Sequence, residues 1–406
     1  MKKISIFVII KKIPKFFIQF LDMVLWHVIL LFYPKKQMYK NAWLICERGV
    51  EAQDNGYWMF KYIKEKHPEI NCYYIINKNN KKDYDKVKKL GPVIELGSFE
   101  HKIAFLMSKV LISTHLGTII NWNYLLYKKL FDRKNNKKFI WLQHGITKDD
   151  ISNIVNKNII SLDIFVTSTV DEANSIKENP NYGFIDEVKL TGLARFDNLN
   201  HYKLKNQILF MPTWRSYILT PSYKKEKLSD KELFLNSDYY ETINSFLNNK
   251  EIIKLLKESN TKLIFYPHFE IQKYLNLFNI KEDNNIILAN KEEYNVQTLL
   301  KESKLLITDY SSVFFDFAYM KKPTILYQFD QDEYFKKHYQ KGYFDYKKDC
   351  FGDICVTEKE LLNSLKKIIN NNFKIEDKYL NKVNKTFKYF DNKNCERIYE
   401  EILKIL

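Results

Sequence analysis

The stretch LLITDYSSVFFDFAYMKKPTILYQFD, residues 305–330, decides the fold. Its first apolar run ends in Asp309-Tyr310-Ser311-Ser312, a short helical pattern follows, and a second apolar run comes after Pro323. Two strand-like runs joined by a helical stretch predict a β-α-β unit in a parallel sheet. Because a helix N-terminus presents free N–H groups and a partial positive charge, the hydroxyls at this turn predict either an N-cap or a phosphate-binding site.

The same alternation of strand and helix patterns extends in both directions along the chain. Upstream strand-like runs include NAWLIC at 41–46, NCYYIIN at 71–77, KVLIST at 109–114, KKFIWLQHG at 137–145, QILFMPTWR at 207–215 and TKLIFYPHF at 261–269. A chain of 406 residues is too long for one ordinary core. We therefore predict an α/β protein with two Rossmann-like, doubly wound domains that face a cleft.

The pattern restarts after GLARFDNLNHYKLKN, residues 192–206, which indicates the domain boundary. The predicted organisation is a basic segment at 1–40, an N-terminal domain at 41–203, a C-terminal domain at 204–375, and C-terminal helices at 376–406.

The N-terminal segment is basic and apolar. The net charge of the chain is +16, and the first 40 residues contain eight Lys and one Asp, a net charge of +7. The 18 residues from Phe16 to Tyr33 are almost wholly apolar, which is near the minimum length for a membrane span. Within them and just before them, the residues Lys15, Gln19, Asp22 and Trp26 recur at helical spacing as a narrow polar stripe. We predict an interfacial helix on an anionic membrane surface, with a spanning helix as the alternative.

Cysteine content and motif content exclude several classes of site. The five cysteines are an odd number without a paired framework, which indicates a reducing compartment. No Cys and His spacing typical of zinc occurs, so we predict no metal site and no cofactor. The basic charge would also suit nucleic acid, but no recognisable nucleic-acid module is present. Asp330-Gln331-Asp332 is interpreted as a solvated turn, and His101 and His115 as structural histidines.

Polar residues that suit phosphate chemistry follow several predicted strands. His144, at a strand end and followed by Gly145, is a candidate base, because histidine can accept a hydroxyl proton near neutral pH. Gly145 lets the backbone approach a ligand closely. His268 has the same place in the second half, and Arg215 suits bidentate phosphate binding. Since ligands bind beyond the carboxyl ends of parallel strands, these residues and the Asp309–Ser312 cluster are expected to face one cleft.

At these motifs the sequence resembles the CDP-glycerol glycerophosphotransferase family, the teichoic-acid polymerases and primases of bacterial envelopes. The matching stretches, in family order from about residue 47 to 402, are ERGVEAQDNGYWMFKYIKEKHPEI, LGSFEHK, LQHG, TGLARFDNL, FMPTWR, ITDYSSVFFDFAYMKKPTILYQFDQDEY and FDNKNCERIYEEI. The resemblance implies a GT-B-like fold, with an acceptor-side domain at 41–203, a nucleotide-binding domain at 204–375 and C-terminal helices at 376–406 that pack back on the N-terminal domain. It also implies peripheral attachment to the cytoplasmic face of the bacterial cell membrane.

The resemblance also implies roles for individual residues. His144 and His268 would be the essential histidines, and Arg215 and the Ser311–Ser312 helix start would lie at the CDP-glycerol phosphates. The remaining candidate substrate-binding residues are Gly145, Thr308 and Asp309, which lie in the matched motifs, and Lys148, which lies in the loop after LQHG. The loop after His144 reads Gly-Ile-Thr-Lys-Asp-Asp, whereas well-known polymerases have Gly-Thr-Pro-Leu-Lys.

The expected activity is transfer of glycerol phosphate from CDP-glycerol to a hydroxyl of a lipid-linked or polysaccharide acceptor, with release of CMP. The changed loop after His144 keeps a second hypothesis open, a GT-B transferase that uses another CDP-alditol or a nucleotide sugar for capsular polysaccharide. A hypothesis of another class is a non-enzymatic basic protein that binds membrane or nucleic acid. The sequence does not determine the acceptor or the oligomeric state.

Overall fold

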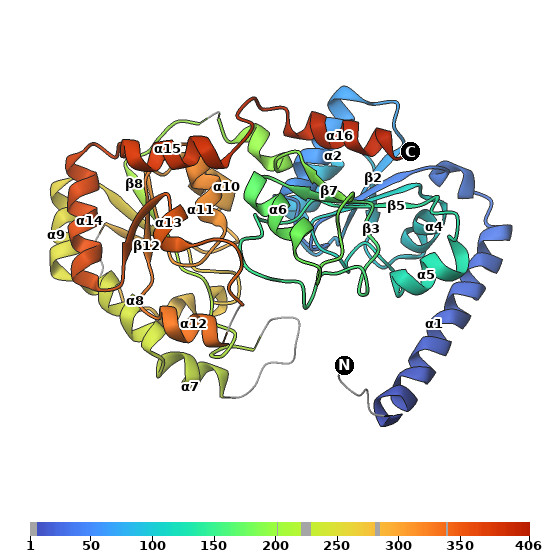
Figure 1. Ribbon diagram of the computed structural model, residues 1–406, viewed down its shortest axis with the longest axis horizontal. Coiled ribbons are helices and arrows are strands. Elements are labelled where there is room, and N and C mark those ends of the chain that lie inside the picture. The colour runs from blue at the N-terminus through green and yellow to red at the C-terminus, as the bar shows by residue number, and fades with distance from the viewer. Residues whose placement is uncertain (1–5, 201, 221–228, 281–284, 338–339) are drawn as a thin grey trace.

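The computed structural model describes residues 6–200, 202–220, 229–280, 285–337 and 340–406, with side chains from Lys15 onward. Two α/β domains lie side by side, and helix α1 (Ile6–Phe32) projects at the outer edge of the N-terminal domain (Figure 1). The arrangement is GT-B-like, which confirms the predicted fold class.

The N-terminal domain is built on a parallel sheet of seven strands within the described residues, in the order β3-β2-β1-β4-β5-β6-β7. The strands are β1 (Trp43–Cys46), β2 (Cys72–Ile76), β3 (Val93–Glu95), β4 (Val110–Ser113), β5 (Lys138–Trp141), β6 (Ile164–Thr167) and β7 (Val188–Leu190). The helices are η1 (Lys36–Tyr39), α2 (Asn55–Lys66), α3 (Lys81–Lys88), α4 (Phe99–Met107), α5 (Tyr124–Phe131), α6 (Val170–Glu178) and η2 (Ala194–Asn198).

The C-terminal domain has a second parallel sheet, with six strands in the described part of the chain, in the order β10-β9-β8-β11-β12-β13. The strands are β8 (Gln207–Met211), β9 (Lys262–Phe265), β10 (Ile286–Leu288), β11 (Leu305–Thr308), β12 (Thr324–Tyr327) and β13 (Gly352–Cys355). The helices are α7 (Asp230–Leu235), α8 (Asp238–Asn248), α9 (Lys250–Glu258), η3 (Gln272–Leu277), α10 (Val296–Glu302), α11 (Val313–Tyr319), α12 (Gln331–Lys337), α13 (Tyr346–Asp349) and α14 (Glu358–Asn370).

The central strands are apolar on both faces because helices cover both faces of each sheet. Strands β1, β4, β6, β11 and β12 are buried at every position, which is typical of doubly wound sheets. The chain order of each sheet reverses beside its first strand, between β1 and β4 in one domain and between β8 and β11 in the other. In such folds, ligands bind at the carboxyl ends of the strands on either side of this switch point.

The two domains share one apolar core. It includes Leu142 of the first domain, Tyr310 and Tyr319 of the second, and Ile398 of the last helix. Helix α15 (Asp377–Thr386) is tied to the C-terminal domain, because the Tyr379 hydroxyl donates to Asp353 at 2.6 Å. Helix α16 (Asn394–Lys404) lies over the N-terminal domain and packs on η2 and α2 (Figure 1). The return crossing is therefore made between α15 and α16.

Helix α1 is docked by its polar stripe. Asp22 accepts hydrogen bonds from the indole N–H groups of Trp122 at 2.7 Å and Trp26 at 3.1 Å. Gln19 accepts from the Asn123 backbone N–H at 3.1 Å, and Met23 is fully buried. Gln19, Asp22 and Trp26 of the predicted polar stripe thus face the protein, Lys15 is exposed, and the apolar face of α1 points outward.

We predict that Gly192→Ala destabilises the protein more than Gly97→Ala. Both glycines have a positive φ, +83° and +76°, so each substitution costs about 1 kcal/mol of backbone strain. A Cβ at position 192 would also overlap Oδ1 of Asn394, whose amide nitrogen donates to Asp197 at 2.7 Å, whereas nothing lies within 4 Å of a Cβ at position 97. The clash should add roughly 1–3 kcal/mol to the loss for Gly192→Ala.

Urea denaturation of the two variants measures the difference in the free energy of unfolding. Equal losses would show that α16 is not held against the turn at Gly192 as described.

Candidate active site at the domain junction

His144 follows β5 on a turn that is held in place by the contacts of the preceding residue, Gln143. Gln143 has a positive φ of 58°, and its buried amide donates to the Val166 carbonyl at 2.6 Å and to Glu172 Oε1 at 3.0 Å. Glu172 also accepts the Thr147 backbone N–H at 2.7 Å. Because these contacts fix the backbone on both sides, the His144 side chain projects from the sheet edge and is exposed.

The His144 turn touches the start of α11 in the other domain. A Cβ at position 145 would overlap the Ser312 hydroxyl, so only glycine allows this approach. Ser311 accepts the Val313 N–H at 3.4 Å, while Ser312 makes no capping bond to the helix. The structure therefore brings His144, Gly145, Ser311 and Ser312 together at the domain junction.

The surroundings of His144 favour its neutral form. Partial desolvation by the surrounding protein lowers the pKa of His144, although the side chain stays accessible to solvent; Asp54 opposes this effect, and Arg48 and Arg195 add to it. The His115 ring stacks on the His144 ring at a centroid distance of 4.9 Å and an interplanar angle of 18°. Burial, with His144 and Arg48 nearby, lowers the pKa of His115 to about 2. A neutral His144 at neutral pH is able to accept a proton.

Arg195, the second residue of η2, connects three parts of the junction. Its Nε and Nη2 donate to the two carboxylate oxygens of Asp316 on α11, at 2.6 and 2.8 Å. Its Nη1 donates to Asp54 Oδ1 at 2.7 Å and to the His144 carbonyl at 3.0 Å. One guanidinium thus joins the N-terminus of α2, the His144 turn and the C-terminal domain.

His268 follows β9 as predicted and is half-buried. Its Nδ1 accepts the Glu270 backbone N–H at 3.2 Å, and its ring stacks on Trp214 at 5.9 Å. Because Nδ1 is an acceptor, the proton of the neutral ring is on Nε2.

Arg215 follows β8 at the strand end, as predicted, but its side chain points into the domain. Its side chain is fully buried, and Nε and Nη2 donate to Asp330 at 2.7 and 2.9 Å, while Nη2 also donates to Asp309 at 2.9 Å. Nη1 donates to the Thr213 carbonyl at 2.6 Å. With its N–H groups used in this way, Arg215 organises the interior of the C-terminal domain and is not presented to a phosphate. Asp330 is correspondingly an ion-pair partner and not a solvated turn residue.

Three other predicted substrate-binding residues also point into the protein. Thr308 donates to the Met211 carbonyl at 2.6 Å, and Asp309 accepts the backbone N–H of Thr213 at 2.8 Å. Lys148 is buried, forms an ion pair with Asp149 and lies over the Tyr346 ring. In this structure these side chains stabilise the loops that carry the exposed groups.

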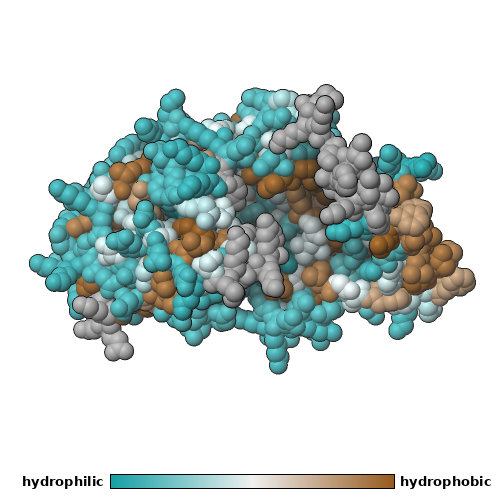
Figure 2. All heavy atoms as spheres, turned by 90° about the horizontal axis from the view of Figure 1, so that it is seen from below, coloured by the Kyte–Doolittle hydropathy of each residue, from teal (hydrophilic) through white to brown (hydrophobic). Residues whose placement is uncertain are grey.

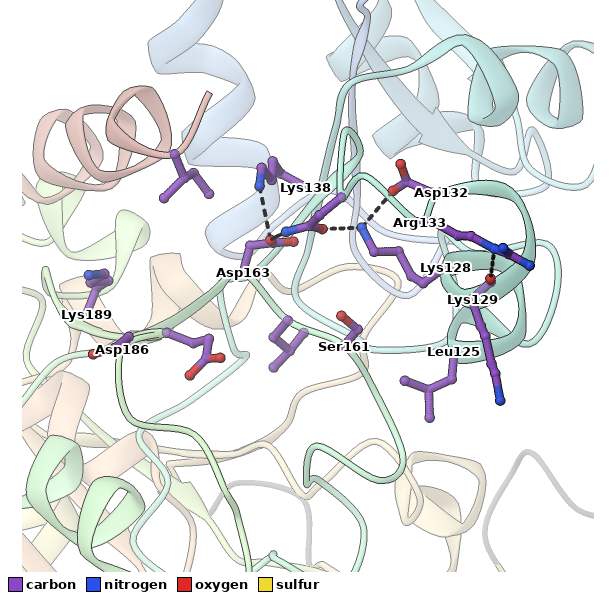
Figure 3. A pocket seen from close by; sticks show the side chains of 14 residues that line it. Leu125, Lys128, Lys129, Asp132, Arg133, Lys138, Ser161, Asp163, Asp186 and Lys189 are labelled. Atoms are coloured by element: carbon purple, nitrogen blue, oxygen red, sulfur yellow. Dashed lines mark hydrogen bonds and ion pairs between the residues drawn. The ribbon is translucent and has the colours of Figure 1, made fainter.

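A cavity of about 870 Å³ opens elsewhere, at the amino ends of β5 to β7 (Figure 3). Its charges are largely paired, with Lys128 bonded to Asp132 at 2.7 Å and Lys138 to Asp163 at 3.6 Å. None of the predicted site residues lines it. Over the described ranges, no group of three or more His, Cys, Asp or Glu side chains is placed to hold a metal ion.

Sequence reasoning missed Arg195, Asp316, Arg48 and the proximity of His115 to His144. One signal was present for Asp316, a lone carboxylate in the apolar helix VFFDFAY. Arg195 lies in the quoted motif TGLARFDNL without a pattern that reveals its partners.

We predict that Asp316→Asn lowers the free energy of unfolding by about 3–5 kcal/mol, because it removes the bidentate, buried counter-ion of Arg195 and leaves the single ion pair with Asp54. Asp332→Asn, the same change at an exposed position on α12, should alter it by less than about 0.5 kcal/mol. Urea denaturation gives both values. A loss at Asp316 no larger than at Asp332 would contradict the structural role of the ion pair.

Comparison with known proteins identifies the family of the chain. A family model described as CDP-glycerol:poly(glycerophosphate) glycerophosphotransferase matches residues 28–404. The minor teichoic acid biosynthesis protein GgaB of Bacillus subtilis is 37% identical over 368 residues, which are 90% of this chain and 40% of that protein. A teichoic acid poly(glycerol phosphate) polymerase of the same organism is 26% identical over 353 residues, 80% of this chain and 44% of that protein. The chain thus spans less than half the length of these two relatives.

The wall teichoic acid polymerase TagF has a similar solved structure, with a TM-score of 0.66, 18% sequence identity and 98% coverage of both chains. At this identity the likeness concerns the fold. The match of the family model over almost the whole chain, together with the GgaB similarity, shows that the chain belongs to the CDP-glycerol:poly(glycerophosphate) glycerophosphotransferase family.

Proposed function

We propose that the protein transfers glycerol phosphate from CDP-glycerol to a hydroxyl group of a lipid-linked or polysaccharide acceptor and releases CMP. The observation that carries the proposal is the close approach of the turn that bears the exposed His144 to the Ser312 hydroxyl at the start of α11, through Gly145. Membership of the family supports CDP-glycerol as the donor.

In the proposed reaction the acceptor oxygen attacks the phosphorus that is bonded to glycerol. A new O–P bond forms, the bond from this phosphorus to the bridging diphosphate oxygen breaks, and CMP leaves with the bonding electrons. His144 takes the hydroxyl proton. Phosphoryl transfer depends mainly on positioning and charge stabilisation, which the Ser311 and Ser312 hydroxyls and the Nε2–H of His268 would supply.

The predicted roles are therefore revised for the buried residues. Arg215, Thr308, Asp309 and Lys148 would act by holding the loops that bear His268, Ser311 and His144. Gly145 would act by leaving room for the Ser312 hydroxyl beside the His144 turn. In this proposal the buried residues affect activity through the position of the exposed ones.

We further propose that the protein is peripheral to the cytoplasmic face of the bacterial cell membrane through α1. The helix is long and apolar enough to span by composition, over Lys15–Phe32, with a mean hydropathy of 1.7. Its contacts through Asp22 and Gln19 nevertheless hold it along the N-terminal domain, which supports an interfacial position. Figure 2 shows apolar surface at the end of the molecule where α1 lies. The exposed side chains are Phe16, Phe17, Ile18, Leu21, Val24, Leu25, Val28, Leu31 and Phe32.

The cysteines fit this location. All five are unpaired and buried, as expected in a reducing compartment. The basic residues that flank the apolar face, including Lys15 and Lys35, would add attraction to anionic lipids.

We predict that the purified protein releases CMP from CDP-glycerol in the presence of a hydroxyl acceptor, and that His144→Ala lowers the rate by about 10²–10⁴-fold. Because the pKa of His144 is lowered from 6.5, the base is neutral at pH 7, and the wild-type rate should fall only as the pH drops through that lowered pKa.

Parallel assays with CDP-ribitol and nucleotide sugars identify the donor. A higher rate with one of these donors would show that glycerol phosphate is not the transferred unit. Near-normal turnover by the His144→Ala variant would show that His144 is not the base.

We predict that the double variant Phe17→Glu and Leu25→Glu binds phosphatidylglycerol vesicles at least about 100-fold more weakly, because each apolar side chain contributes about 1.5–3 kcal/mol when buried in lipid. Ile154→Glu with Ile185→Glu, which places the same charges on exposed apolar residues away from α1, is the matched control.

Co-sedimentation measures the binding. Unchanged binding of the α1 variant would locate the attachment elsewhere, and wild-type protein that resists carbonate extraction would show that α1 spans the bilayer.

A further inference from the structure

The switch point of the N-terminal sheet carries two side chains outside the predicted site, Arg48 and His115, the second of which was interpreted as structural. Arg48 follows β1 and His115 follows β4, the two strands between which the chain order reverses. Their side chains meet, because Arg48 Nε donates to His115 Nε2 at 3.1 Å. In a doubly wound sheet this is the place where a ligand is expected.

The pair is connected to the proposed base. Since Nε2 of His115 accepts the Arg48 N–H, the proton of its neutral ring is on Nδ1, which lies 2.8 Å from the Thr114 hydroxyl. The His115 ring stacks on His144. Through these contacts, His115 holds Arg48 near His144.

Arg48 also reaches the other domain. Its guanidinium carbon lies 5.5 Å from the centre of the Phe269 ring, and Phe269 is the residue after His268. The guanidinium therefore lies next to the stacked rings of His115 and His144 and next to the loop that carries His268. A phosphate bound between His144 and His268 would be within reach of the Arg48 guanidinium.

The guanidinium is only partly committed to protein partners. Its Nη1 makes a long ion pair of 3.4 Å with Glu51, Nη2 has no hydrogen-bond partner among the residues described, and the side chain is 38% exposed. An exposed guanidinium with spare N–H groups suits a diphosphate.

The other four arginines of the chain are used differently. Arg195 and Arg215 are buried in ion pairs. Arg397 is bonded to Asp391 and to the Thr191 carbonyl, and Arg133 lies after α5, beside the cavity at the opposite end of the sheet. Of the five arginines, Arg48 is thus the one whose side chain is exposed at the domain junction.

We propose that Arg48 binds the diphosphate of the donor, the role that the sequence suggested for Arg215, with His115 as its positioning residue. This inference rests on the proposed use of a CDP-activated donor. The contact holds the phosphates beside His144 from the N-terminal domain, opposite the serines of the C-terminal domain.

Isothermal titration of the full-length protein with CDP-glycerol tests the proposal. Arg48→Gln should weaken binding about 10–100-fold, the value of a charge-assisted hydrogen-bond pair. Arg48→Lys should regain part of the affinity, since it keeps the charge and loses the planar fork. Arg133→Gln, which removes the same charge from an exposed site outside the junction, should leave the affinity unchanged.

Cytidine serves as the ligand without phosphate, with its affinity measured by ligand-observed NMR. Loss of CDP-glycerol affinity with unchanged cytidine affinity supports the assignment. Equal losses for both ligands, or no loss for either, overturn it. If the wild type binds CDP-glycerol and Arg48→Gln binds it equally well, the assignment of Arg48 alone fails; if the wild type does not bind CDP-glycerol, the proposed donor fails and the assignment fails with it.

Discussion

The bidentate ion pair between Arg195 and Asp316 is the interaction on which the arrangement of the two domains depends. Their side chains are 8% and 2% exposed, so neither charge is solvated by water to a useful extent. A buried charge is tolerated only when its partner is in place. Since Arg195 comes from η2 of one domain and Asp316 from α11 of the other, the pair is complete only when the domains meet as they do here. The same guanidinium holds the His144 carbonyl and so couples domain packing to the position of that histidine.

The two domains contribute to the junction in different ways. In the C-terminal domain the switch point is filled by Arg215, Asp309 and Asp330, which form a closed internal network below the serine-bearing turn. In the N-terminal domain the switch point remains accessible, and Arg48, His115 and His144 line its edge. One side is thus a rigid support that presents hydroxyl groups, and the other presents ionisable groups. This asymmetry suits a reaction in which the phosphates must be held still while a proton moves.

The sequence predicts the strands and their ends well, because buried parallel strands are continuous apolar runs that end in polar residues. His144, His268 and Ser311 follow β5, β9 and β11 as expected. Strand β13 was missed, since Gly352 and Asp353 interrupt the apolar pattern that marks the other strands. The stripe on α1 was recognised from its helical spacing, but spacing does not tell which face a helix buries.

The partners of the buried polar side chains could not be predicted from the sequence, for a different reason. Arg215 stands at a strand end like a phosphate ligand, and only the folded chain brings Asp309 and Asp330 to it from distant positions in the sequence. The same holds for Arg195 and Asp316, and for Arg48 and His115. The local sequence pattern therefore locates the edge of the sheet where the candidate site lies, whereas the division between exposed and buried polar groups at that edge depends on tertiary packing.

A crystal structure of the His144→Asn variant soaked with CDP-glycerol is the most direct test of the account. The account predicts that the diphosphate lies at the domain junction, between the residue-144 turn and the Ser311–Ser312 helix start, with the glycerol-bearing phosphorus nearest position 144. A nucleotide bound elsewhere, for example in the cavity lined by Lys128 and Asp163, would contradict it.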